Sequence, residues 1–302
     1  MQVIEPLTIT DSILTSSNVP EDDYAEWSSG TTYNLGDRVI VVSVHKVYES
    51  ATNSNTNNDP TTDGGTNWLE VGATNRWKAF DQKLSDPVQQ SNSISYTFTT
   101  TQSIVNSIAF FALAADTVQI TVTPFGAGSP VYDETYDLLD TTSIIDWYTY
   151  FFDPAGVKER ELLVVDLPSY SSATITITIT DTGNTAEVGQ IVMGNLISLG
   201  RTGYGTTVGI EDYSRKERDT FGNAVIIERA FAQKADYEVE ITTQDTRRVQ
   251  RFLSEYRAKP VVWVGNQDTS YGLIVYGFYT QFSINLATPS ISYTTLEVEG
   301  LT

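Results

Sequence analysis

The residues best suited to bind a ligand are four aromatic side chains near the N-terminus. Trp27, Tyr33, Tyr48 and Trp68 are interleaved with a glycine turn and a polar loop. So small a segment needs only part of these rings for its own core. We therefore expect at least two of the four to be core, and the others to face solvent, where exposed rings usually bind a partner.

The segment has a motif in which aromatic residues flank a Gly-Asp turn. In chain order it reads Trp27, Tyr33-Asn34-Leu35-Gly36-Asp37-Arg38-Val39, Tyr48, Pro60 and Trp68. It resembles the small carbohydrate-binding modules of the chitin- and cellulose-binding type. The resemblance implies a three-stranded module over residues 24–73, whose rings stack on the apolar C–H faces of sugars. The long polar loop at residues 53–59 leaves the position of Trp68 relative to Trp27 open.

Catalytic chemistry finds little support. His45 is the only histidine and the chain has no cysteine, so Ser-His-Asp and Cys-His catalysis would need His45 itself. We expect His45 on a strand surface. The adjacent carboxylates Asp133-Glu134 and Glu211-Asp212 would point to opposite faces of a strand and could not flank one glycosidic bond. The polar run at 57–59 could hold calcium but lacks EF-hand spacing. We predict no enzyme, no cofactor and no metal site.

Charge narrows the possible partners. The 302 residues include 38 acidic and 18 basic side chains, a formal charge of −20 at pH 7. Residues 1–200 carry 25 acids and 7 bases, whereas residues 201–302 carry 13 and 11. An acidic field repels phosphate backbones, so nucleic acid is not an expected partner. No run of 18 apolar residues and no basic start before an apolar segment is visible, so we expect neither membrane insertion nor a secretory signal.

The spacing of apolar residues predicts the elements that position these groups. Residues 1–23 are expected to form an arm that adds a strand to another domain or another subunit. Residues 74–198 alternate polar and apolar side chains at 95–99, 118–122 and 174–180, which is typical of half-buried antiparallel strands and favours a β-sandwich. The continuous apolar run at 162–165 is more typical of a strand buried on both faces.

Two stretches of this sandwich are Arg76-Trp77-Lys78-Ala79-Phe80-Asp81 and Ser107-Ile108-Ala109-Phe110-Phe111. They resemble jelly-roll sandwiches of the galactose-binding type, which implies a jelly-roll-like domain.

The C-terminal third, residues 199–302, has a different pattern. Apolar residues at i, i+3, i+4 and i+7 predict an amphipathic helix from Gln244 to Arg257, capped by Thr243 and stopped by Pro260. Strands are expected at 237–241, 261–264, about 272–284 and about 290–299, giving an α+β domain with one helix on a sheet. The fold class is therefore mainly β.

Two basic clusters lie in this near-neutral third: Arg215, Lys216 and Arg218, then Arg247, Arg248 and Arg251. They either meet the acidic body of a neighbouring subunit, giving head-to-tail assembly into a closed ring, or form a solvated surface.

Residues 205–222 and the ending Leu296-Glu297-Val298-Glu299-Gly300 resemble tail-tip and baseplate proteins of tailed bacteriophages. The resemblance implies a virion protein of the phage tail, made in the host cytoplasm, that forms a homo-oligomer such as a trimer or hexamer. Its expected partners are other tail or baseplate proteins and bacterial surface polysaccharide. One alternative is a receptor-binding fibre, although the chain lacks heptads and glycine repeats. Another is a secreted polysaccharide-binding protein or hydrolase, although catalytic motifs are missing.

Overall fold

The computed structural model describes residues 1–139, 146–152, 158–218, 220–268 and 271–302. Most of these residues lie in β-strands, so the predicted mainly β class is confirmed. The α-helices of the described part are α1 (Trp147–Phe152) and α2 (Thr246–Glu255). Three 3₁₀ turns accompany them: η1 (Val42–Val44), η2 (Asn75–Phe80) and η3 (Thr243–Asp245). Within the described ranges, neither helix has the length and hydropathy needed to span a membrane.

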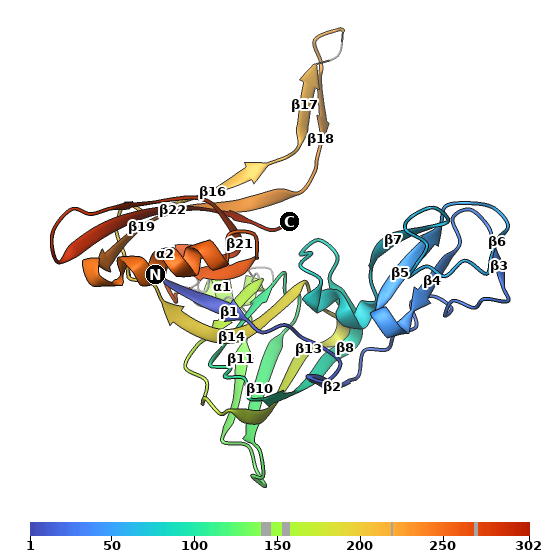
Figure 1. Ribbon diagram of the computed structural model, residues 1–302, viewed down its shortest axis with the longest axis horizontal. Coiled ribbons are helices and arrows are strands. Elements are labelled where there is room, and N and C mark those ends of the chain that lie inside the picture. Colours follow the sequence, from blue (N-terminus) through green and yellow to red (C-terminus); the bar gives the residue numbers. More distant parts are fainter. Residues whose placement is uncertain (140–145, 153–157, 219, 269–270) are drawn as a thin grey trace.

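A ten-stranded antiparallel sheet runs through the body of the molecule (Figure 1). Its strands are β1 (Gln2–Pro6), β9 (Ser107–Phe111), β12 (Glu161–Val164), β14 (Gln190–Ser198), β15 (Arg201–Thr202), β16 (Thr207–Asp212), β19 (Phe231–Thr242), β20 (Val261–Val264), β21 (Ile274–Asn285) and β22 (Ile291–Gly300). The order is β12-β9-β14-β1-β20-β21-β22-β19-β15, and β16 also pairs with β19. The run at 162–165 was expected to be buried on both faces. It lies mostly in β12, whose residues are mainly half-buried. β12 is an edge strand, because β9 pairs with only one of its two edges.

Strand β1 joins the two halves of this sheet. One of its edges pairs with β14 and the other with β20, and the side chains of Val3 and Ile4 are completely buried. The N-terminal arm thus adds a strand within its own chain. Because β1 offers a hydrogen-bonding edge to each neighbour, the sheet continues past the expected domain boundary between residues 198 and 199.

A second, five-stranded sheet packs against the first. It consists of β2 (Leu14–Ser17), β8 (Val88–Thr101), β10 (Thr117–Pro124), β11 (Tyr132–Asp137) and β13 (Ser172–Val188), in the order β11-β10-β13-β8-β2. The three alternating stretches predicted as strands lie in β8, β10 and β13. Their apolar side chains, such as Phe98 and Ile177, share one buried cluster with Phe110 of β9 and Ile191 of β14. The core of the body therefore lies between the two sheets.

The predicted C-terminal helix is confirmed as η3 followed by α2. Its apolar stripe faces the large sheet, where Val249 and Leu253 are buried in a cluster with Trp263. Thr243 does not cap the helix as expected. Its hydroxyl donates instead to the carbonyl oxygen of Thr288 at 3.0 Å, which anchors the helix start to the loop between β21 and β22.

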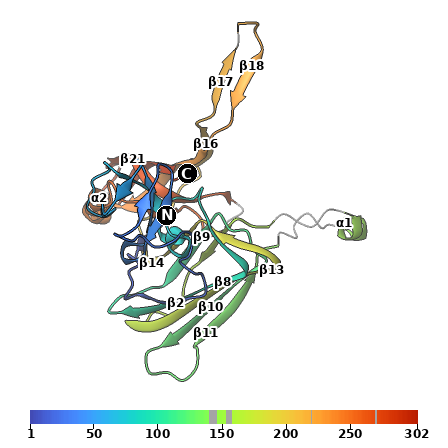
Figure 2. The ribbon, with the colours of Figure 1, turned by 90° about the vertical axis from the view of Figure 1, so that its right-hand side faces the viewer.

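Three parts project from this body. Residues 24–73 contain a two-stranded sheet of β3 (Thr32–Tyr33) and β6 (Asn55–Thr56), and a three-stranded sheet of β4 (Arg38–Val41), β5 (Lys46–Ser50) and β7 (Trp68–Ala73). A hairpin of β17 (Arg215–Arg218) and β18 (Ala224–Ile227) rises beyond β16 and β19 (Figure 1). Helix α1 stands out on another side (Figure 2).

Candidate functional site

Three of the four rings predicted to bind sugar lie inside the core of residues 24–73. The exposed fractions of Tyr33, Tyr48 and Trp68 are 9%, 7% and 2%. Tyr33 and Trp68 meet edge to face, with ring centroids 5.1 Å apart, and the Trp68 indole N–H donates to the carbonyl oxygen of Asn58 at 2.9 Å. Buried rings have no free face for a sugar, so the predicted role of these three is wrong. So small a segment uses them to build its own core.

Trp27 is not an open platform either. Its ring is half-buried against the same cluster, and its indole nitrogen is buried without a hydrogen-bond partner. The exposed ring of Tyr24 is covered in part by the Arg38 guanidinium, 5.8 Å from the ring centroid. Within residues 24–73, the five predicted or nearby rings therefore do not form an exposed stack.

His45 does not lie on a strand surface. It lies where residues 24–73 meet the rest of the molecule, and its partners Glu21, Asp11 and Trp77 are outside this segment. Its Nδ1 lies 2.8 Å from Glu21 Oε1 and its Nε2 lies 2.9 Å from Asp11 Oδ1, while its ring stacks on Trp77 at 4.1 Å. Carboxylates only accept hydrogen bonds, so both bonds form together when each ring nitrogen carries a proton. This arrangement is a structural clamp. In the described part of the chain, no three histidine or acidic side chains gather to hold a metal ion.

The first predicted assembly cluster lies on the hairpin. Arg215, Lys216 and Arg218 follow one another on β17 and are exposed. Two of them already have acidic neighbours: Arg215 pairs with Glu217 at 2.6 Å, and Lys216 Nζ lies 2.6 Å from Asp212 Oδ2. The hydrogen bond from Lys216 holds the pKa of the Asp212 carboxyl well below its usual range. Part of the positive charge of this cluster is therefore neutralised within the chain.

The second predicted cluster lies on α2, away from the hairpin (Figure 1). Arg247, Arg248 and Arg251 are exposed on the helix. Arg248 donates to Asp245 Oδ1 at 3.1 Å and to the carbonyl oxygen of Ser198 at 3.0 Å, so it holds the helix to the end of β14. The structure does not bring the two basic clusters into one site.

The sequence reasoning missed the hairpin as a surface feature. We call residues 207–218 and 220–231 the hairpin arm. At its tip, charged β17 pairs with apolar β18, so Lys216 lies opposite Ile226 and Glu217 opposite Val225. Because consecutive residues of a strand point to opposite faces, β18 presents apolar side chains on both faces of the ribbon. The exposed apolar residues of the arm are Val208, Ile210, Tyr213, Phe221, Val225, Ile226, Ile227 and Phe231.

A ribbon of this kind is unusual at a free surface. Isolated two-stranded hairpins are marginally stable in water, and unpaired strand edges are a template for pairing with another chain. The tip has neither a third strand nor a covering helix among the described residues, and Ile226 is 67% exposed. One signal in the sequence could have found it. The apolar run 224–227 follows the Gly222-Asn223 turn and is typical of a strand buried on both faces.

Comparison with known protein families finds no match to this chain, and comparison with curated proteins finds none either. Its own geometry thus gives the class: a mainly β protein whose most distinctive surface is the apolar hairpin arm.

Proposed function

We propose that this protein is a structural subunit of the tail tip or baseplate of a tailed bacteriophage, where it forms a homo-oligomer and contacts other tail or baseplate proteins. The observation that supports assembly most strongly is the hairpin arm. Its apolar strand β18 is exposed on both faces, and exposed apolar surface of this kind marks a protein interaction site.

Two independent observations concern the arm: its sequence resemblance to phage tail proteins and its exposed apolar strand β18. The stretch 205–222, whose sequence resembles phage tail proteins, includes strands β16 and β17 of the arm. A ribbon that no other described part of its chain covers suits a subunit that completes its fold on a neighbour. When the same patch of each copy meets a different patch on the next, the contact is head-to-tail, and it forms a ring when the rotation between copies closes.

The finer details of the fold belong to the same proposal. We propose that residues 74–198 form a jelly-roll-like sandwich, which is supported by the buried cluster shared between the two sheets. Residues 24–73 keep a fold like that of a carbohydrate-binding module but act as a packing element. The buried rings give no support for binding of surface glycan by Tyr33, Tyr48 and Trp68.

The test is the mass of the purified protein by light scattering coupled to size exclusion. We expect a defined trimer or hexamer for the wild type. Replacing Ile226 with glutamate should dissociate it, because a charge would enter an apolar contact, while in the free hairpin the new carboxylate lies opposite Lys216 and is tolerated.

The matched control is Val131→Glu, which adds the same charge at a comparably exposed valine between β10 and β11, strands that Figure 1 shows away from β17 and β18. This variant should keep the wild-type mass. A wild type that stays monomeric at high concentration, or an Ile226→Glu variant that assembles as well as Val131→Glu, would overturn the proposal.

A further inference from the structure

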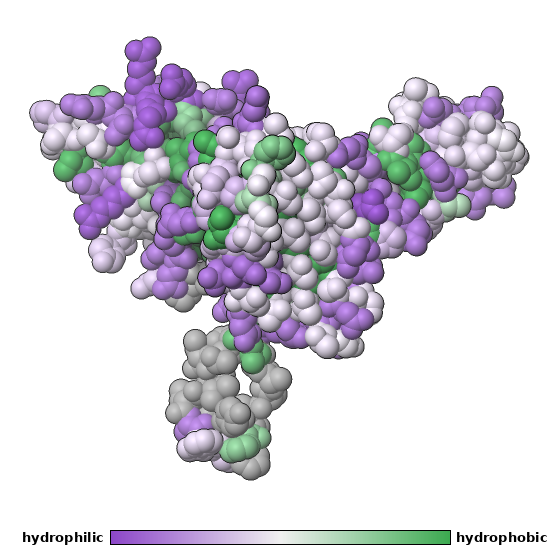
Figure 3. Space-filling model, turned by 90° about the horizontal axis from the view of Figure 1, so that it is seen from below, coloured by the Kyte–Doolittle hydropathy of each residue, from purple (hydrophilic) through white to green (hydrophobic). Residues whose placement is uncertain are grey.

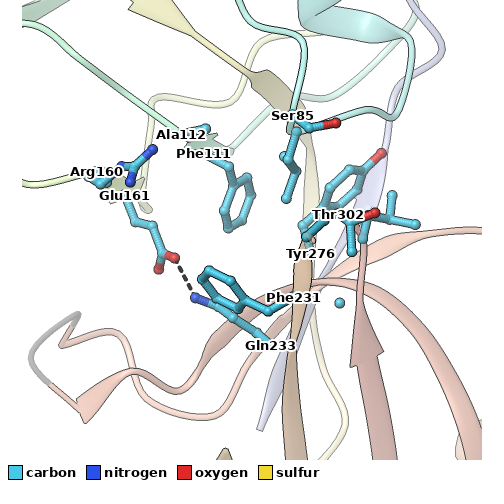
Figure 4. A pocket seen from close by; sticks show the side chains of 13 residues that line it. Ser85, Phe111, Ala112, Arg160, Glu161, Phe231, Gln233, Tyr276 and Thr302 are labelled. Atoms are coloured by element: carbon cyan, nitrogen blue, oxygen red, sulfur yellow. Dashed lines mark hydrogen bonds between the residues drawn. The ribbon is translucent and has the colours of Figure 1, made fainter. Parts of the chain in front are cut away.

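A cavity of about 310 Å³ lies between strands β9 and β12 on one side and β19, β21 and β22 on the other. Three aromatic rings line it, and Figure 4 shows them around one space. Phe111 and Tyr276 are buried and stack with ring centroids 5.6 Å apart, while Phe231 is 56% exposed. Ser85 and Arg160 also line the cavity and are exposed, so they mark its mouth. The cavity is therefore aromatic inside and open to solvent.

The size and enclosure of this cavity suit a small ligand. Small-molecule sites are clefts of roughly 300 to 1,000 Å³ that bury most of the surface of the ligand and have mainly apolar walls. The open surface offers less. On the face of the molecule seen in Figure 3, hydrophobic residues are scattered in small groups among hydrophilic ones. A small apolar group is therefore better accommodated by the cavity than by this face.

Glu161 places a carboxylate in the wall of the cavity. Its Oε1 accepts a hydrogen bond of 2.8 Å from the Gln233 amide, which is a neutral partner (Figure 4). Burial raises the pKa of the Glu161 carboxyl, and it outweighs the Gln233 hydrogen bond and the Arg160 charge, which both lower it. The chain thus supplies less positive charge than this carboxylate needs. Because buried charges are normally paired, a cation is the group that completes the site.

The lining of the cavity selects the kind of cation. Aromatic rings attract cations to their faces, most strongly where water is excluded. A primary ammonium carries three N–H donors that need acceptors, and a wall made mainly of rings and aliphatic side chains offers few. A quaternary ammonium has no N–H and presents methyl groups to the wall. Since an apolar cavity of about 150 Å³ accepts benzene, this one has room for a trimethylammonium group with a short chain.

We propose that the cavity binds a small quaternary ammonium ion whose charge is balanced by the Glu161 carboxylate. The methyl groups of the ion pack against the three rings, and the rest of the ligand extends towards the mouth. All the lining residues belong to one chain, so the site goes beyond the proposed assembly and is expected in a monomer as well as in an oligomer.

Calorimetric titration of the protein with choline, at mildly alkaline pH and constant ionic strength, tests this site. The control ligand is the neutral analogue of choline in which a carbon atom replaces the nitrogen. It has the same shape without the charge, so it should bind at least about tenfold more weakly than choline. Phosphocholine is a further probe, because the same ammonium group also occurs as a phosphate ester. Tighter binding of phosphocholine than of choline assigns the ester, whose phosphate the exposed Arg160 can contact, and equal or weaker binding assigns the free ion.

Three variants locate the binding. Glu161→Gln keeps the shape of the side chain and should weaken choline binding by at least about tenfold, with no effect on the neutral analogue. Phe231→Leu removes one ring at an exposed position and should weaken it by about threefold. The matched control is Glu159→Gln, which removes an exposed carboxylate two residues from Glu161 and outside the lining, and should change the affinity by less than about twofold.

Each of three results would overturn the proposal. The first is a wild type that binds neither choline nor phosphocholine at millimolar concentration. The second is a neutral analogue that binds as tightly as choline. The third is an affinity for choline that both Glu161→Gln and Phe231→Leu leave unchanged. Circular dichroism of each variant checks that the fold is kept. Phe231→Leu still tests the cavity if Glu161→Gln fails this check, because the Phe231 ring is largely exposed.

Discussion

Replacing Gly194 with alanine tests the role of β1 as the strand that joins the two halves of the large sheet. Gly194 lies on β14 opposite Pro6 of β1. A Cβ atom at this position would lie 1.8 Å from the carbonyl oxygen of Glu5 and 2.8 Å from its carbonyl carbon. Both atoms belong to the backbone, so no side-chain rotation relieves the clash. β1 itself must move.

The size of the effect follows from this distance. Contacts of real Cβ atoms are almost never closer than 3.0 Å, so the oxygen must move by about 1 Å or more. The adjacent hydrogen bond from Leu7 N to the Met193 carbonyl oxygen is 2.8 Å long and would stretch out of range. This bond and one neighbouring bond of the β1–β14 ladder, at about 1 kcal/mol each, together with partial loss of Ile4 packing, give a loss of about 3 kcal/mol.

The assay is urea unfolding followed by tryptophan fluorescence and far-ultraviolet circular dichroism. The control is Gly209→Ala in β16, where an added Cβ would meet nothing within 4 Å. We expect Gly194→Ala to lower the free energy of unfolding by about 3 kcal/mol, and the control to change it by less than about 1 kcal/mol. Equal effects of the two substitutions would refute the reasoning, because the clash would then have no consequence for the sheet.

Three further changes have defined outcomes. Trp68→Ala should lower the free energy of unfolding by about 3 to 5 kcal/mol in denaturant titrations, whereas truncating its exposed neighbour Leu69 should change little. Glu161→Gln should gain stability relative to the wild type as the pH rises above 4.5. Burial raises the pKa of the Glu161 carboxyl, so this group stabilises the fold below its ordinary pKa and loses that contribution as the pH rises. Thermal melts of both proteins at paired pH values measure the difference. His45→Gln removes the Trp77 stack and the hydrogen bond to Glu21, at a loss of about 2 kcal/mol against a Val44→Gln control in the same titrations.

Local patterns in the sequence predicted much of the fold. The alternation at 174–180 indicated β13, and the apolar stripe ending before Pro260 indicated α2, because both periods reflect one buried face of a single element. The place of β1 could not be found in this way. Which two strands its edges meet depends on partners about 190 and 260 residues away, and no local period encodes that pairing.

For a related reason, the sequence could not tell whether the aromatic rings of residues 24–73 bind a ligand or form a core. Ring type and spacing show that Tyr33, Tyr48 and Trp68 belong together, but a core and a binding platform use the same residue types. Burial decides between them, and burial follows from the whole packed segment.

The hairpin arm was missed because the two strands at its tip lack the alternation of polar and apolar residues that marks a half-buried strand. β17 is charged throughout and β18 apolar throughout, so neither reads as a strand with one buried face.

The charge of the chain leads to a last prediction about assembly. Each copy carries a formal charge of −20, so copies repel one another. The cations of the arm offset this only in part, because Arg215 and Lys216 already pair with acids of their own chain. The Debye length falls from about 30 Å at 0.01 M salt to about 8 Å at 0.15 M, while apolar contacts at Ile226 are not screened. Moderate salt should therefore lower the concentration at which the oligomer dissociates. If salt raises it instead, ion pairs from the two basic clusters hold the copies together, and the apolar strand β18 is not the main contact.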